Sequence, residues 1–182
     1  ALLSVRITLF NNLPLITWGL TAFWLVFIVN AINFFDNMDA LAGGTAAVAS
    51  FFFALIAALR GQYFVANLGF VTCGTVCGFL FFNRPPASIF MGDGGSQFLG
   101  FMLGTLGALT TYYVPGESPT PAPVLIPLLI LGVPIFDLLA VVCIRIRHRK
   151  PFYRGDNRHI SHRFEKMGLG RPLAVFLVLL LV

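Results

Sequence analysis

Three short polar motifs interrupt an otherwise apolar sequence, and their residue types suit phosphoryl chemistry. They are Asn33-Phe-Phe-Asp36-Asn37-Met-Asp39, Phe90-Met-Gly-Asp93-Gly-Gly-Ser96 and Asp156-Asn-Arg-His159-Ile-Ser-His162-Arg163. A charge at membrane depth costs roughly 2.5–3.5 kcal/mol on insertion scales, so acids among apolar segments indicate a functional site. Phosphoryl transfer needs positioning together with charge neutralisation by metal and cationic groups, and the three motifs contain groups that suit both tasks.

The first motif has the oxygen ligands that a hard cation prefers. Asn30, Asn33 and Asp36 are spaced three residues apart, which places them on one helix face, and Asp39 follows one turn later. Mg²⁺ usually binds one or two carboxylates, keeps several waters and takes phosphate oxygens from the substrate. A hydrogen-bonded stripe between two packed helices is the alternative, although two carboxylates exceed what packing requires. We therefore predict a Mg²⁺ site at the end of this helix.

The second motif predicts an anion-binding turn. Asp93 lies between glycines, and Ser96 is the expected N-cap of a helix over 97–113. A helix N-terminus behind a glycine turn binds phosphate through its backbone N–H groups. Upstream, Asn83 can pair with the edge of a base and Phe90 offers a stacking face. Buried packing is the alternative for both of these residues.

The third motif is basic. His159 and His162 are three residues apart, and Arg158 and Arg163 flank them. A structural zinc site would need further ligands. Arginine forks and imidazoles suit a diphosphate, and a solvated basic loop attracted to anionic lipid is the alternative.

The composition excludes an ordinary soluble domain, with 58% hydrophobic residues, 10% charged residues and a mean hydropathy of +0.88. About 20 apolar residues cross the hydrocarbon core. Five segments satisfy this requirement, and a sixth begins near residue 172 and is cut off at Val182. The five are 14–35, 41–59, 63–82, 97–113 and 123–144. We expect an all-α polytopic membrane protein and a fragment of a longer chain.

Basic residues set the expected orientation. Nine of the twelve Lys and Arg residues lie between Arg145 and Arg171, and the positive-inside rule places that loop in the cytoplasm. Binding of nucleic acid is the alternative explanation for these basic residues, but it is less simple than the positive-inside rule. Counting spans backwards from it brings all three motifs to the cytoplasmic face. Asp137 lies within a predicted span, where we expect a structural role.

The motifs resemble those of the polyprenyl-phosphate N-acetylaminosugar-1-phosphate transferases. This superfamily includes bacterial UDP-GlcNAc:undecaprenyl-phosphate enzymes and phospho-MurNAc-pentapeptide transferase. The stretch from Asn83 to Ser96 matches closely. Asn37 and Ala40 replace glycines of the family's first motif, and Ser161 replaces the middle histidine of the third. The family's adjacent acidic pair, which belongs to an earlier loop, has no counterpart in this sequence.

The resemblance implies roles for particular residues. The implied catalytic residues are Asp36, Asp39, Asp93 and His159; the implied substrate-binding residues are Asn83, Phe90, Arg158, His162 and Arg163; and the implied metal ligands are Asn33 and Asp93. Within this scheme Asn83 and Phe90 bind uracil, and the basic motif binds the diphosphate or the sugar. The implied cofactor is Mg²⁺, with Mn²⁺ as an alternative.

The implied reaction transfers HexNAc-1-phosphate from a UDP-sugar to undecaprenyl phosphate and releases UMP, with GlcNAc favoured as the sugar. Residues 1–182 would then be one integral-membrane catalytic domain fragment. The resemblance places it in a larger fold of about 10–11 spans, each of about 20 residues. It would lie in the bacterial cytoplasmic membrane with its site facing the cytoplasm, without nucleic acid, and the family suggests a homodimer. A transporter with an ion pathway and a noncatalytic relative of the transferases are the alternatives.

Overall fold

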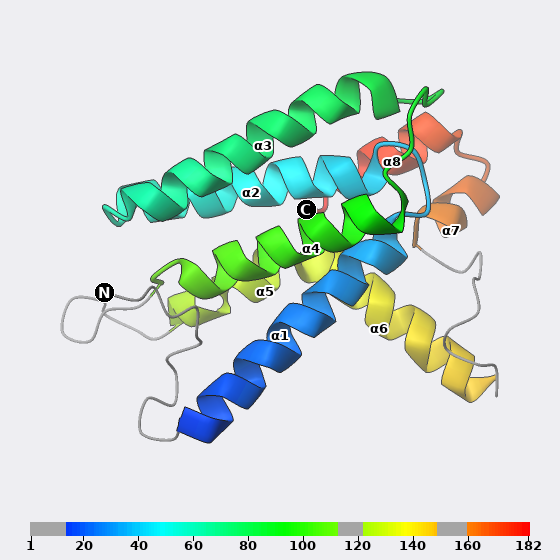
Figure 1. Cartoon of the computed structure of the whole chain (residues 1–182). Coiled ribbons are helices and arrows are strands. Elements are labelled where there is room, and N and C mark those ends of the chain that lie inside the picture. Colours follow the sequence, from blue (N-terminus) through cyan, green and yellow to red (C-terminus); the bar gives the residue numbers. More distant parts are fainter. Residues whose placement is uncertain (1–13, 113–121, 149–159) are drawn as a thin grey trace.

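The computed structural model describes residues 14–112, 122–148 and 160–182, and every regular element in these ranges is a helix (Figure 1). The helices are α1 (Pro14–Phe35), α2 (Leu41–Leu59), α3 (Tyr63–Asn83), α4 (Gly92–Leu109), the 3₁₀ helix η2 (Ala122–Leu125), α5 (Ile126–Ile130), α6 (Gly132–Arg147), α7 (Ile160–Lys166) and α8 (Arg171–Leu179). The expected all-α class is therefore confirmed for the described residues.

Three of these helices are long and apolar enough to cross a membrane. They are α1 from Leu15 to Phe35, α2 and α3, and their mean hydropathies are 2.0, 1.9 and 1.8. Only 28% of the α1 window and 28% of the α3 window are buried inside the bundle, which leaves most of both apolar surfaces for lipid. The chain is thus a multi-pass membrane protein. The expected total of five spans and a partial sixth stays a prediction.

Two helix pairs form the centre of the bundle, α2 with α3 and α1 with α4. Glycine allows both close approaches. A Cβ at Gly100 of α4 would lie 2.7 Å from the Cα of Val29, and a Cβ at Gly69 of α3 would lie 2.8 Å from the Cβ of Ala54. Small residues at such crossings let membrane helices approach backbone to backbone. Fully buried Phe53 and Leu103 belong to the apolar core among these helices.

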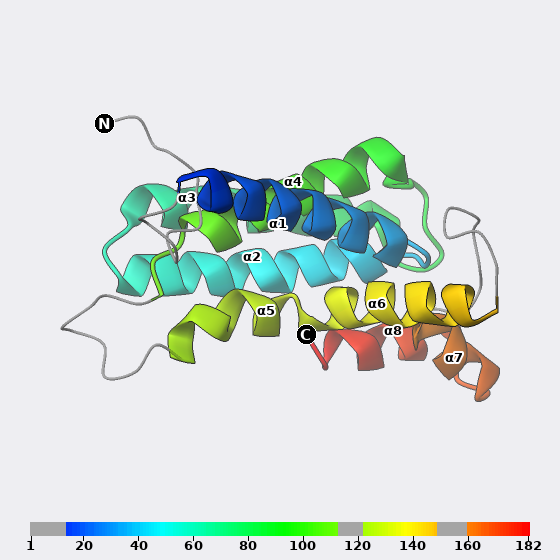
Figure 2. The same ribbon diagram turned by 90° about the horizontal axis from the view of Figure 1, so that it is seen from below.

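A second layer completes the described structure. Figure 2 shows α5, α6 and α8 on the opposite side of α2 from α1 and α4. Helix α6 contacts α1, α8 contacts α2, and α7 packs against α8. Because of this arrangement, the C-terminal part of the chain returns to α1, which carries the first motif, and to α2, which follows it.

The segment expected as one span over 123–144 is not one helix. It is divided into η2, α5 and α6, and the break lies at Leu131. Proline explains the break, because Pro134 has no N–H to donate to the carbonyl of Ile130 and its ring crowds that carbonyl. The prediction of a continuous helix here was wrong.

Candidate active site

The first motif leaves the helix earlier than expected. Helix α1 ends at Phe35, and residues 36–40 form a tight turn before α2. In this turn the backbone N–H of Asn37 donates to the carbonyl of Phe35 at 2.9 Å, and Ala40 has a left-handed φ of 63°. The prediction that Asp36 and Asp39 extend a helical stripe was therefore wrong, since both acids lie on this turn, which we call the acidic loop (residues 36–40).

The second motif enters its helix earlier than expected. Helix α4 starts at Gly92, whose φ of +64° makes the turn into the helix, so Asp93 lies in its first turn. Ser96 is not an N-cap. It is fully buried within α4, and its hydroxyl donates back to the carbonyl of Gly92 at 3.1 Å. An acid in the first turn of a helix is favoured by the macrodipole.

Direct contacts join these two motifs. The amide nitrogen of Asn33 donates to Ser96 Oγ at 2.9 Å and to Asp93 Oδ1 at 3.3 Å. The Asn33–Asp93 contact spans 60 positions of sequence. The close α1–α4 crossing at Gly100 positions both helix ends for it. Two of the three predicted motifs therefore form one site.

The acids of this site affect one another. The pKa of Asp36 is raised from 3.8 to about 6, first by burial and then by the negative charges of Asp93 and Asp39. Burial disfavours the ionised carboxyl, and neighbouring carboxylates add repulsion. A concentration of negative charge at one end of a membrane bundle is an environment that a cation stabilises.

A third contact fastens the 84–91 segment to the acidic loop. The side chain of Asn83 accepts from the amide of Ala40 at 2.9 Å and donates to the carbonyl of Ile89 at 2.8 Å. Asp39 Oδ2 accepts from the amide of Ala87 at 3.2 Å. Asn83 is 6% exposed, so both polar ends of its side chain already bind backbone. Its recognition of a base stays a prediction.

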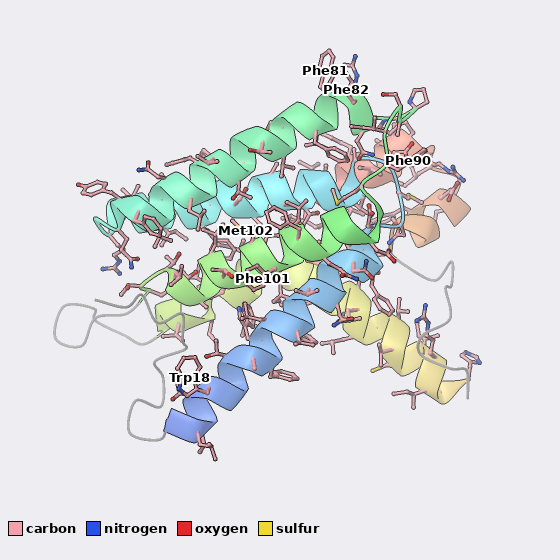
Figure 3. The ribbon with its side chains drawn as sticks, viewed as in Figure 1. Trp18, Phe81, Phe82, Phe90, Phe101 and Met102 are labelled. Atoms are coloured by element: carbon pink, nitrogen blue, oxygen red, sulfur yellow. The ribbon has the colours of Figure 1, made fainter. Side chains whose placement is uncertain are left out.

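Phe90 differs from Asn83 in being exposed at the surface of the bundle. Its side chain is 77% exposed, and it lies where the 84–91 segment meets α4 (Figure 3). Phe81 and Phe82 mark the nearby end of α3, whereas Trp18 lies toward the far end of α1. An exposed aromatic face beside the site is available for stacking, and the predicted contact of Phe90 with a base is untested.

The start of the third motif reaches the same loop. Figures 1 and 2 place α7 at the end of the bundle that carries the acidic loop and the start of α4. The Ser161 hydroxyl donates to Asn37 Oδ1 at 2.5 Å, and the amide of Ile160 donates to Asp137 Oδ1 at 2.7 Å. Asp137 is buried, as expected of a structural residue. Sequence reasoning singled out Asn37 and Ser161 as departures from motifs, but nothing in the sequence indicated their contact.

The basic side chains of the third motif are not described. Arg158 and His159 lie outside the described residues. His162 and Arg163 belong to α7, and their side chains also lie outside the description. The roles expected for these four residues stay predictions.

The donor set at Asn33 and Asp93 fits a magnesium ion. Among the described residues, no three His, Cys, Asp or Glu side chains are grouped to hold a metal by themselves. Mg²⁺ does not require such a group, because it combines one or two carboxylates with water and substrate phosphate. Asp93 lies beside the Asn33 amide, with the charge of Asp36 close by, and this set provides the oxygen ligands that Mg²⁺ prefers.

The fold and site define a class of protein. A multi-pass helical bundle gathers acidic side chains at one end, next to a helix N-terminus, and phosphoryl transfer uses groups of this kind to position charged substrates. The comparison with known families agrees with this class. Residues 2–111 match the sequence profile described as Glycosyl transferase family 4, and the chain belongs to that family.

Two individual relatives match over about nine-tenths of the chain. It is 38% identical over 164 residues to a Bacillus subtilis (strain 168) protein named "Probable undecaprenyl-phosphate N-acetylglucosaminyl 1-phosphate transferase", a match over 90% of this chain and 45% of that protein. It is 36% identical over 171 residues to phospho-N-acetylmuramoyl-pentapeptide-transferase of Clostridioides difficile (strain 630), over 91% and 49%. The corresponding Bacillus velezensis enzyme is 46% identical over 96 residues, or 51% of this chain and 30% of that enzyme. The chain spans less than half the length of these relatives.

Proposed function

We propose that this chain is part of an enzyme that transfers a sugar phosphate to a polyprenyl phosphate. The donor is a UDP-N-acetylhexosamine, with UDP-GlcNAc preferred, and the acceptor is undecaprenyl phosphate. An oxygen of the lipid phosphate attacks the β-phosphorus of the donor and forms a new P–O bond. The bond from that phosphorus to the bridging oxygen breaks, and UMP leaves with the electron pair.

One observation carries this proposal: the contact of Asn33 with Asp93 and Ser96. It joins the end of α1 to the start of α4 and concentrates carboxylates where a helix N-terminus can face a phosphate. The family membership and the relatives named as transferases of phosphorylated sugars support the same reading. A transporter would more often hold its acids near the bilayer midplane, whereas these acids lie at helix ends.

Each element of the site has a task in this proposal. Asn33 and Asp93 would hold Mg²⁺ or Mn²⁺, and a bound ion supplies positive charge that offsets the charge of the diphosphate. Asp36 and Asp39 shape the site around them. Phe90 stacks on the uracil and Asn83 contacts its edge, while His159 and its neighbours Arg158, His162 and Arg163 bind the diphosphate or the sugar.

The proposed setting is the bacterial cytoplasmic membrane, with the site facing the cytoplasm, where UDP-sugars are made. Helices α1, α2 and α3 are long enough to span the membrane. In this proposal the shorter apolar helices complete a total of five spans and part of a sixth. We propose no nucleic-acid partner, and a homodimer is the suggested assembly.

The test uses the full-length protein that contains this chain. Membranes that express it are supplied with Mg²⁺, undecaprenyl phosphate and radiolabelled UDP-GlcNAc. We expect label in a lipid product with matching release of UMP, and we expect Asp93→Asn to reduce transfer at least about 100-fold, as for loss of a charged group that acts in the transition state. Asn30→Ala is the control, because Asn30 is exposed and its side-chain amide donates within α1, to the carbonyl of Val26.

Two results would contradict the proposal. Transfer that persists in Asp93→Asn would show that this site does not catalyse the reaction. A lack of transfer with UDP-GlcNAc and with every other UDP-HexNAc offered, from a protein that is folded in the membrane, would leave only a noncatalytic role.

A further inference from the structure

Helix α7 is held at two consecutive residues by side chains from distant parts of the chain. Ser161 Oγ donates to Asn37 Oδ1, and the amide of Ile160 donates to Asp137 Oδ1. Ser161 is 0% exposed and Asp137 is 2% exposed. Both hydrogen bonds are part-buried, and two such contacts at consecutive residues restrict the position and the rotation of the helix.

Asn37 also contacts α1. Its amide nitrogen donates to the carbonyl of Phe34 at 3.3 Å, and the last carbonyls of a helix have no partner within that helix. One carboxamide therefore joins the end of α1 to α7, although Asn37 and Ser161 are 124 positions apart. Because Asn37 lies in the acidic loop, this link sets where α7 lies relative to Asp36 and Asp39.

Apolar packing alone would leave this arrangement loosely specified. Helix α7 has seven residues, too few for a helix to be stable by itself. Ile160 and Phe164 pack on a small cluster built around Phe35 and Val175. Apolar contacts of this kind are not directional, so directional polar contacts select the orientation of α7. They include those of Asn37 and Asp137 and an exposed ion pair of Glu165 with Arg171 of α8 at 2.8 Å.

We propose that Asn37, Ser161 and Asp137 form a polar clamp that positions α7 against the acidic loop and thereby sets the affinity for the sugar nucleotide. Each is a positioning residue, and none is assigned a contact with substrate. The clamp acts by fixing α7, the helix to which His162 and Arg163 belong, relative to the acidic loop. Asn37 and Ser161 both depart from the family's motifs, and they are hydrogen-bonded to each other here. The part concerning donor affinity rests on the proposed function.

The first test measures coupling in stability, which does not depend on activity. The thermal midpoint of the purified full-length protein is compared for wild type, Asn37→Ala, Ser161→Ala and the double variant. Removing one partner of a buried hydrogen bond leaves the other unsatisfied, whereas removing both does not. We expect the double variant to melt no lower than Asn37→Ala, which also loses the contact with Phe34. Strictly additive losses would overturn the clamp.

Ser50→Ala is the matched control. Ser50 is also 0% exposed, and its hydroxyl donates within α2 to the carbonyl of Ala46 at 2.6 Å. Its effect on the thermal midpoint should add to that of Asn37→Ala. Coupling between Ser50 and Asn37 as large as that between Ser161 and Asn37 would show a general loss of packing, which also overturns the clamp.

The second test separates binding from chemistry. In Ser161→Ala we expect KM for UDP-GlcNAc to rise about tenfold, with kcat and KM for undecaprenyl phosphate within about twofold, as for an interaction that acts equally in ground and transition states. Asp137→Asn, which keeps an acceptor oxygen for the amide of Ile160, should be closer to wild type than Asp137→Ala. A loss in kcat alone, or equal rises in both KM values, would overturn the assigned role.

The two proposals fail differently. A wild-type protein that transfers no sugar phosphate would contradict the proposed function, and the stability cycle would still decide whether the clamp exists. Transfer by the wild type together with additive stability losses would overturn the clamp alone.

Discussion

The two central helix pairs both pack closely at a glycine, but the side-chain contacts at their site ends differ. Gly100 lets α4 approach α1, and Gly69 lets α3 approach α2, each to a distance that a Cβ would obstruct. At the site end, α1 and α4 meet through the side chains of Asn33, Asp93 and Ser96. At the same end, α2 and α3 meet through the Asn83 amide, which binds the backbone of Ala40 and Ile89.

This difference distinguishes the helix pair that gathers the proposed reactive groups from the helix pair that holds the backbone in place. The contact between α1 and α4 lies near Asp36, whose pKa is raised to about 6 first by burial and then by the negative charges of Asp93 and Asp39. The contact between α2 and α3 satisfies backbone groups of Ala40 and Ile89, and Asp39 beside it accepts from the backbone amide of Ala87. Equal disturbance of the two crossings should therefore damage activity unequally.

Valine at each glycine crossing is the strongest test. Gly100→Val and Gly69→Val both add a branched side chain against backbone or Cβ atoms less than 3 Å away, and each should cost about 1–3 kcal/mol of stability. Only Gly100→Val displaces Asn33 from Asp93, and a misplacement of about 1 Å can cost about 100-fold in rate. Transfer assays on both variants, normalised to folded protein, check the contrast. Equal losses of activity would remove the distinction between the pairs.

Asn83→Ala tests the supporting contact. It removes both hydrogen bonds of a buried amide and leaves the amide of Ala40 and the carbonyl of Ile89 unsatisfied, so we expect a loss of about 2 kcal/mol. Thermal unfolding of the purified protein measures it. Asn30→Ala, at an exposed position whose side chain bonds within α1, should change stability by less than about 0.5 kcal/mol. Similar losses in both variants would argue against the fastening role of Asn83.

Asp36→Asn tests the charge at the site. A raised folded-state pKa means that the folded protein binds the proton of Asp36 more tightly than the unfolded chain does. The resulting destabilisation is absent below pH 3.8, where Asp36 is neutral in both states, and is complete above pH about 6, where it is ionised in both. Asparagine removes that penalty, and after allowance for solvent screening we expect a gain of about 1 kcal/mol. Unfolding in EDTA between pH 4 and 8 should show the gain growing as pH rises toward 6. A gain that is independent of pH would contradict this origin.

Ala40→Gly should give the smallest effect, a stabilisation. Ala40 has a φ of 63°, a conformation that costs a non-glycine residue about 1–2 kcal/mol. Glycine relieves this cost but gives the unfolded chain about 0.4–1 kcal/mol more freedom, so the net gain is about 0.5 kcal/mol. Ala42→Gly in the first turn of α2 is the control and should destabilise the protein by up to about 1 kcal/mol. A loss in both variants would contradict the strain at Ala40.

Long apolar runs and their interruptions were sufficient to predict much of the architecture. The span bounds expected at 14–35 and 41–59 agree with α1 and α2, although the helix that carries the first motif was expected to continue to Asp39. Burial in lipid makes composition nearly decisive for such helices, because every backbone group must be satisfied within the segment. The sequence also predicted that the first two motifs converge, since short turns between spans return the chain to one face.

Only the tertiary structure decided which side chains meet. Helix ends depend on local turns, so Asp36 left its helix while Asp93 entered one. The choice of Asn83 as a fastener depends on backbone groups left unpaired by the left-handed residue at Ala40. The contact between Asn37 and Ser161 spans 124 positions, and a pattern of short period carries no information about partners at that separation. Apolar runs determine where the chain crosses, whereas individual hydrogen bonds between distant segments determine what the ends of those crossings can do.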